Sequence, residues 1–209
     1  MSVVSTSGAS PQPRRRLPAW LKWLCTLCAI LWLPVMLRYY GAQNQLWLCE
    51  LDNLLLVVAL WLESRLLFSA LLVGLLLVDL GWMVDLLVAL LTGLHPFAAT
   101  ATMFTAALPL PVRLGSLFHL TVPVIVLYAV LRLGYDRRGF WWQTGFTALA
   151  LLAAYLLTPP AANVNWVWGP GGCAPQPWLP APLYLLICAV AYPLLLYLPV
   201  HLAARRWLR

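Results

Sequence analysis

Long runs of apolar residues, separated by short polar or proline-rich breaks, dominate the chain. The runs cover about residues 18–37, 46–62, 66–88, 115–131, 141–157 and 181–203. Each is close to the ~20 residues that a helix needs to cross ~30 Å of hydrocarbon. Because the runs are continuous and do not alternate with polar residues, they predict helices and not the strands of a membrane β-barrel. We therefore predict an all-α fold, a polytopic membrane helical bundle with six transmembrane helices.

The first run follows a small, polar segment that ends in three arginines, residues 1–16. A secretory signal peptide would have a shorter apolar core and a small-residue cleavage site before Arg38. We expect 1–16 to be a disordered basic cytoplasmic tail and 17–209 to be a single transmembrane helical domain.

The stretch 93–113 is apolar but rich in threonine, and it contains Pro96, Pro109 and Pro111. Its core of about 13 residues is too short to span a bilayer. It suits a short re-entrant or interfacial segment between the third and fourth helices.

The distribution of basic residues favours six spans over seven. With six spans, only Arg38 and Arg113 of the 13 Lys and Arg residues fall on the outer side. The inner side then holds Arg14, Arg15, Arg16, Lys22, Arg65, Arg132, Arg137, Arg138, Arg205, Arg206 and Arg209. A seventh span at 93–113 would move the later clusters outside and remove this bias. We expect a multi-pass protein of the plasma (bacterial inner) membrane with both termini cytoplasmic.

The composition agrees with this class. Hydrophobic residues make up 63% of the chain and charged residues only 9%, against about 25% charged residues in soluble domains. A soluble enzyme, a disordered chain and a coiled coil are therefore excluded. The net charge is +7, and the basic residues that cause it lie at the ends of apolar runs. They therefore indicate how the chain is oriented in the membrane, with membrane lipids and not nucleic acid as partners.

Polar residues on at least four predicted segments share one depth, near the outer surface. A polar or ionisable residue inside a membrane is costly and is by default a functional candidate. The set comprises Cys49, Glu50, Asp52 and Asn53 in the second span, Asp79 and Asp85 in the third, His119 in the fourth, and Asn163 and Asn165 in the outer loop.

Within this set, Cys49 and His119 are the natural reactive pair. An imidazole within hydrogen-bond reach can take the proton of a thiol, and the thiolate is then a strong nucleophile. Asp52, Asp79 or Asp85 would orient the imidazole, and Asn165 or backbone amides would stabilise an oxyanion. We predict Cys49, His119, Asp79 and Asp52 as catalytic residues, and Glu50, Asn53, Asp85, Asn163 and Asn165 as substrate-binding residues. The substrate would be a lipid ester at headgroup depth.

Other interpretations stay open. Cys49 is equally a small packing residue or the partner of Cys173 in a disulfide, which would exclude it as a nucleophile. Cys25-x-x-Cys28 lacks the context of a redox motif. Three histidines at three depths predict neither a metal site nor a cofactor. The alternative function is a non-catalytic membrane protein: an assembly factor, a lipid-binding subunit or a small transporter.

Short motifs add a resemblance. Leu46-Trp47-Leu48-Cys49-Glu50, followed by Ser64-Arg65, resembles the Leu-His-Leu-Cys-Asp start of the second core helix in YwaF-type bacterial membrane proteins. The Arg113–His119 segment and Asn165-Trp166 resemble two further motifs of that family. These proteins are related to the superfamily of transmembrane acyltransferases and androgen-induced-gene lipid hydrolases. The resemblance spans about residues 46–168 and implies Cys49 as the acyl-accepting nucleophile and His119 as its base. Trp47 and Glu50 depart from the family pattern.

Overall fold

The computed structural model of the protein describes residues 16–171 and 175–208, and this part of the chain is helical, with no strand. The helices are α1 (Ala19–Tyr40), α2 (Leu48–Leu62), α3 (Arg65–Thr92), α4 (Leu110–Gly115), α5 (Phe118–Leu133), α6 (Gly139–Leu157), α7 (Ala181–Ala191) and α8 (Leu198–Trp207). A π-helical segment, Tyr192–Tyr197, joins α7 to α8. Four 3₁₀ turns cover Ala42–Leu46, Ala101–Phe104, Pro160–Ala162 and Val164–Trp166. The predicted tail lies outside the described residues except for Arg16.

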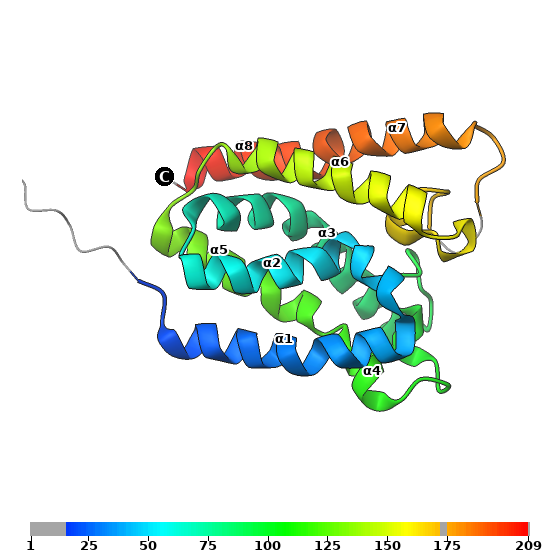
Figure 1. Cartoon of the computed structure of the whole chain (residues 1–209), viewed down its shortest axis with the longest axis horizontal. Helices are drawn as coiled ribbons and strands as arrows, with labels where there is room; N and C mark the ends of the chain where they lie inside the picture. Colours follow the sequence, from blue (N-terminus) through cyan, green and yellow to red (C-terminus); the bar gives the residue numbers. More distant parts are fainter. Residues whose placement is uncertain (1–15, 172–174, 209) are drawn as a thin grey trace, which may run out of the picture.

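The long helices run alternately in opposite directions along one axis (Figure 1). Because α1 begins and α8 ends at the left of that view, both ends of the described chain lie on one side of the bundle. We call this side the terminal end; it also carries the connections 63–64 and 134–138. The opposite side, the loop end, carries 41–47, 93–109, 158–171 and 175–180.

Five helical stretches are long and apolar enough to cross a membrane, which indicates an integral membrane protein. They are Ala19–Tyr40, Arg65–Thr92, Leu110–Leu133, Gly139–Leu157 and Ala181–Trp207. The predicted second span corresponds to α2, which has 15 residues. A helix of that length measures about 22 Å, less than the ~30 Å of the hydrocarbon core. The all-helical membrane architecture is confirmed, and the count of six spans stays a prediction.

The segment between α3 and α4 is irregular apart from the short turn Ala101–Phe104. It ends at Pro109, after which α4 leads into α5 through only two intervening residues. The fourth span therefore begins about one turn earlier than the sequence predicts. A re-entrant position of 93–109 stays a prediction.

Many large apolar side chains lie on the outside of the bundle. Leu91 on α3 is 75% exposed, and Leu149 on α6 is 69% exposed. A water-soluble protein rarely leaves such a continuous apolar surface open, whereas lipid tails cover it at no cost. Trp20, Trp141 and Trp207 are exposed at the terminal end, where interfacial anchors belong.

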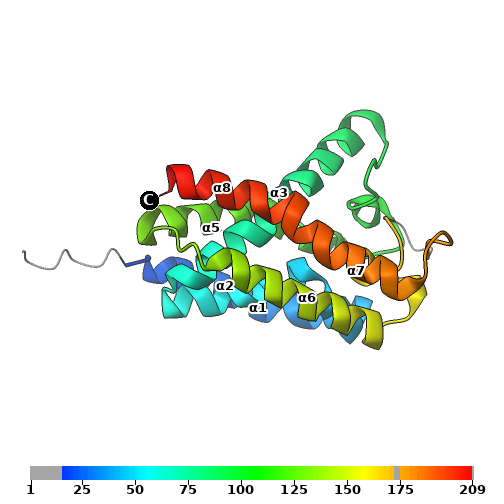
Figure 2. The same ribbon diagram turned by 90° about the horizontal axis from the view of Figure 1, so that it is seen from above.

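Helix α3 packs against α2, α5 and α6 and forms the centre of the bundle. Its first half is buried almost without interruption from Phe68 to Leu75. Its second half leaves the bundle toward the segment that follows it (Figure 2), and there Leu87 and Leu90 are exposed. The buried polar residues of α3 are therefore covered by different segments: Asp79 by α5 and Asp85 by the segment that follows α3.

Two glycines set the close approach of α3 and α6. A Cβ at Gly139 would lie 2.7 Å from the Ala70 nitrogen, and a Cβ at Gly74 would lie 2.3 Å from the Gln143 side chain. Real Cβ contacts are not this short, so a larger residue at Gly139 would push the helices apart, whereas one at Gly74 would displace the Gln143 side chain. Gly74 thereby leaves the room in which the side chain of Gln143 lies.

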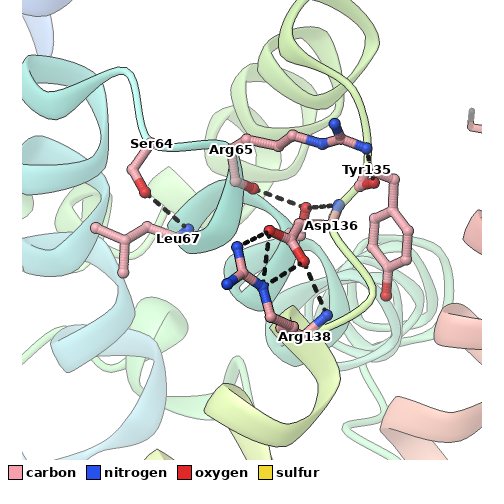
Figure 3. A network of polar contacts seen from close by, with 7 residues as sticks. Ser64, Arg65, Leu67, Tyr135, Asp136 and Arg138 are labelled. Atoms are coloured by element: carbon pink, nitrogen blue, oxygen red, sulfur yellow. Dashed lines mark hydrogen bonds and ion pairs between the residues drawn. The ribbon is translucent and has the colours of Figure 1, made fainter.

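A polar network closes the terminal end (Figure 3). The Arg65 guanidinium donates to the carbonyl oxygen of Tyr135. The Ser69 hydroxyl donates to the Arg65 carbonyl at 2.8 Å and accepts the Asp136 N–H at 2.8 Å. Arg138 pairs with the Asp136 carboxylate at 2.8 Å. This network ties the connection between α5 and α6 to the start of α3.

Candidate functional site

Asp79 and His119 form a hydrogen-bonded pair inside the bundle. The Nδ1 atom of His119 on α5 lies 2.7 Å from Oδ1 of Asp79 on α3. Asp79 is fully buried and His119 nearly so. Because an ionised carboxylate only accepts hydrogen bonds, Nδ1 carries the proton, and Nε2 of the neutral ring is then a base. This is the relation between acid and imidazole that catalytic triads use.

Aromatic rings fix the orientation of the imidazole. Trp82, one turn after Asp79 on α3, stacks on His119 with centroids 4.8 Å apart and planes inclined by 25°. Phe118 lies 4.2 Å from the same ring. One face of α3 thus supplies both the carboxylate and the aromatic wall of the histidine site.

Cys49 is the second residue of α2, at the loop end of the bundle. Its thiol is free and half-buried. Helices α2 and α5 both pack against α3, so the four residues predicted as catalytic lie on three neighbouring helices. No hydrogen bond joins Cys49 to His119 within the described part of the chain. Catalytic contacts are often long in the absence of substrate.

Asn165 fixes the start of α2. Its Oδ1 accepts the N–H of Leu48, the first residue of the helix, at 2.8 Å, and its Nδ2 donates to the Leu46 carbonyl at 2.8 Å. Tyr192 donates its hydroxyl to the Asn165 carbonyl at 3.2 Å. Asn165 also has a positive φ of 54°, a strained conformation that the surrounding bonds maintain. The loop 158–171 and the π-helical segment thus hold the turn that carries Cys49.

Asp52 faces a polar side chain that the sequence analysis missed. The Nε2 atom of Gln143 on α6 donates to Asp52 Oδ2 at 3.2 Å. Both side chains are 1% exposed. Asp52 Oδ1, Gln143 Oε1 and Asp79 Oδ2 are buried without a hydrogen-bond partner. Such orphaned oxygens are rare in folded proteins and call for an explanation.

A second missed pair lies beyond Gln143, one turn along α6. The hydroxyls of Thr147 and Tyr197 are 2.7 Å apart, and both residues are buried. The i→i+5 bonding of the π-helical segment brings Tyr192 and Tyr197 toward one face. Their rings lie 6.3 Å apart. The sequence analysis selected neither ring, and in the structure they extend the buried polar region from α6 to the loop end.

Asp85 lies in a different place from the catalytic candidates. Its carboxylate accepts the N–H of Phe97 at 2.7 Å and the N–H and hydroxyl of Thr100 at 2.9 and 2.7 Å. His95 Nδ1 lies 3.8 Å away. Asp85 thus anchors the segment after α3 onto that helix. Its predicted contribution to substrate binding stays a prediction.

The other predicted binding residues surround the first turns of α2 and the outer loop. Glu50 Oε1 accepts a hydrogen bond from Asn44 Nδ2 at 3.2 Å, and Asn53 is half-buried on α2. Asn163 Oδ1 accepts the Trp168 N–H at 2.9 Å. Their predicted role in substrate binding also stays a prediction.

The sequence analysis also raised a Cys49–Cys173 disulfide, a redox motif at Cys25 and Cys28, and a metal site. Cys173 lies outside the described residues, so the predicted alternative of a Cys49–Cys173 disulfide rests on sequence alone. Cys25 and Cys28 are free on the peripheral helix α1. Among the residues that the structure describes, no group of three or more His, Cys, Asp or Glu side chains could hold a metal ion.

No protein-family model, curated protein or solved structure matches the chain. The functional assignment of the site therefore depends on its geometry. His119 is a base whose partner carboxylate, Asp79, is in place, and Cys49 supplies a thiol on the neighbouring helix α2. Among the described ion pairs, none joins a lysine or an arginine to Asp52 or Asp79.

Proposed function

We propose that the protein is an integral membrane lipid acyltransferase or lipid ester hydrolase, with Cys49 as the nucleophile and His119 as the base. The observation that carries this proposal is the buried Asp79–His119 pair, 2.7 Å apart, in a bundle that also holds the half-buried Cys49 thiol at the start of α2. A charged residue inside a membrane span costs at least ~2.5 kcal/mol on insertion scales. An acid and an imidazole buried together on two helices are therefore more than packing residues.

In the proposed reaction the acyl group is transferred twice, first from the lipid ester to Cys49 and then from Cys49 to water or an acceptor hydroxyl. His119 Nε2 takes the proton of the Cys49 thiol, and the sulfur attacks the ester carbonyl carbon. A C–S bond forms, the ester C–O bond breaks, and the imidazolium returns its proton to the departing alcohol oxygen. Water or an acceptor hydroxyl then attacks the thioester and gives its proton to His119, and the released thiolate recovers that proton. Asp79 stays ionised throughout and stabilises the imidazolium.

The position of the site favours a lipid substrate. Cys49 is in the first turn of α2, and the loop end that surrounds it lies away from the basic terminal end. With the termini in the cytoplasm, as the positive-inside rule favours, this turn lies near the outer headgroups of the plasma membrane. The ester bonds of phospholipids are located at that depth. The resemblance of Leu46–Glu50 to YwaF-type proteins points to the same chemistry.

A non-catalytic membrane protein is the second candidate, and specific contacts favour it. Asn165 uses its side chain to hold α2, and Asp85 uses its own to hold the segment after α3. In this case Cys49→Ser and His119→Ala would leave function intact, whereas bulky changes at helix interfaces would not.

Labelling with a thiol-reactive lipid probe tests the proposal. Wild-type protein in lipid vesicles is treated with the probe, and the modified residue is located by mass spectrometry. We expect rapid labelling of Cys49, its loss in Cys49→Ala and its slowing in His119→Ala. Cys188→Ala is the matched control, because Cys188 is a free, buried thiol on α7. Equal labelling of wild type and Cys49→Ala would remove the hypothesis.

A further inference from the structure

The six acidic side chains of the chain differ in what neutralises them. Glu63 is paired with Lys22 at 2.6 Å and Asp136 with Arg138 at 2.8 Å. Asp79 is bonded to His119, and Asp85 accepts backbone N–H bonds. Glu50 and Asp52 accept their described hydrogen bonds from neutral amides, those of Asn44 and Gln143. Of these two acids, Asp52 is the more deeply buried, at 1% exposure against 8%.

The groups that face Asp52 supply no positive charge. Gln143 lies on α6, Tyr197 is in the π-helical segment, and Cys49 is on α2 itself. The charged neighbour is Asp79 on α3, which has the same sign as an ionised Asp52. Two carboxylates close together in a buried site do not both ionise. Asp79 has an imidazole as its partner, so the charge belongs to Asp79.

Two oxygens of the Asp52–Gln143 contact have no hydrogen-bond donor, which indicates that a proton lies between them. Gln143 donates to Asp52 Oδ2, while Asp52 Oδ1 and Gln143 Oε1 are both acceptors without a donor. A carboxylic acid and an amide associate through two parallel hydrogen bonds, N–H to O=C and O–H to O=C. One proton on Oδ1 supplies the second of these bonds. A buried ion, by contrast, would lose its hydration, and such groups neutralise instead.

We propose that Asp52 and Gln143 form a proton-binding site in the interior of the bundle, in which Asp52 is a neutral carboxylic acid that donates to the Gln143 amide oxygen. This site does not depend on the acyl chemistry proposed for Cys49. It leaves Asp79 as the single negative charge next to His119. Gly74 belongs to the site, because only a residue without a Cβ leaves the space that the Gln143 amide fills.

Infrared spectroscopy of the full chain in lipid bilayers tests this assignment. A protonated carboxyl has a C=O stretching band that is separate from the bands of carboxylates and amides. We expect this band in wild-type protein at neutral pH, and we expect Asp52→Asn to remove a component of it that Glu50→Gln, at the other buried acid with an amide partner, leaves in place. Asp136→Asn is the matched control and should leave the band unchanged, because Asp136 is ionised and paired with Arg138. An unchanged band in Asp52→Asn would overturn the proposal.

A second variant keeps the test decisive if Asp52→Asn does not fold. Gln143→Leu retains the acid but removes its hydrogen-bond partner, so the band should persist and shift to higher frequency. A band that does not move in Gln143→Leu would contradict the acid–amide pair. A wild-type band that is absent in sodium buffer and appears only when sodium is removed would assign the site to a cation, and would also overturn the proposal.

Discussion

Asp136 at the terminal end and Asp79 in the interior show two different uses of an aspartate. Asp136 accepts bonds from the side chain and the backbone N–H of Arg138, and its own N–H donates to Ser69. Asp79 has one bond, to His119, and its second oxygen is buried without a partner. Both carboxylate oxygens of Asp136 thus have hydrogen-bond partners at the terminal end. Asp79 is 0% exposed and still has one oxygen without a partner.

This difference separates a structural network from a candidate reactive one. A saturated network gains stability and orients its chain segments, as the Asp136 turn does between α5 and α6. A buried network with orphaned acceptors loses stability unless a proton, a water or a substrate completes it. The comparison therefore supports the proposal that the reactive region surrounds Asp79, and the following variants test it.

The largest effect is expected for Asp79→Asn. This change retains the shape of the side chain but removes the charge that holds the His119 tautomer and stabilises the imidazolium. We expect the rate of Cys49 labelling by the lipid probe to fall about 10²–10⁴-fold. Asp136→Asn should leave the rate unchanged. A rate in Asp79→Asn that equals that of wild type would show that the pair is only a packing contact.

A large structural effect is expected for Gly139→Leu. Its side chain would collide with the backbone of α3 at Ala70, and we expect unfolding in detergent to become easier by about 1–3 kcal/mol. Gly145→Leu is the control on the same helix, since no atom lies within 4 Å of a Cβ there. Equal losses in both variants would contradict the close α3–α6 contact.

A moderate effect is expected for Asn165→Ala. The Leu48 N–H would lose its acceptor, which removes about 0.5–2 kcal/mol, as for other helix caps. Hydrogen exchange at the Leu48 amide should accelerate, and Cys49 labelling should slow with it. Val58→Ala, at an exposed position on the same helix, should change neither. Unchanged exchange at Leu48 would mean that Asn165 does not hold the start of α2.

The smallest effect is expected at the terminal end. Arg138 lowers the pKa of Asp136 from its ordinary value through hydrogen bonds and charge. Because the folded state holds this proton less tightly than the unfolded state, the pair contributes stability above the unfolded pKa of about 4. That contribution is small because the Arg138 side chain is exposed, and it is lost as the pH falls further. Melting temperatures of wild type and Asp136→Asn should differ at neutral pH and converge in acid.

Much of the architecture could be predicted from the sequence, because lipid requires long apolar helices. The predicted run 141–157 agrees with Gly139–Leu157, and 181–203 lies within Ala181–Trp207. Helix α2 is the exception, since 42–46 form a separate 3₁₀ turn and shorten the helix. The π-helical segment has no recognisable signal in the sequence, because its bonding depends on how α7 and α8 pack.

That polar residues of two helices meet could be predicted, but their exact partners could not. Shared depth made Asp79 and His119 candidates together, and only the rotation of α3 decides that Asp79 and not Asp85 meets the imidazole. Gln143 was missed because it falls near the inner start of the predicted run 141–157, away from the predicted outer depth of the candidates. A signal was present: Gly139, Gln143 and Thr147 are spaced by four and share one face of α6.

Detection of an acyl thioester on Cys49 tests the central claim most directly. Purified protein is incubated with phospholipid vesicles, quenched in acid and analysed by intact and peptide mass spectrometry. We predict a fatty-acyl adduct on Cys49 that hydroxylamine removes, that is absent in Cys49→Ala and that is strongly reduced in His119→Ala. No adduct in wild type over many hours, or an adduct of equal yield in His119→Ala, would contradict the account.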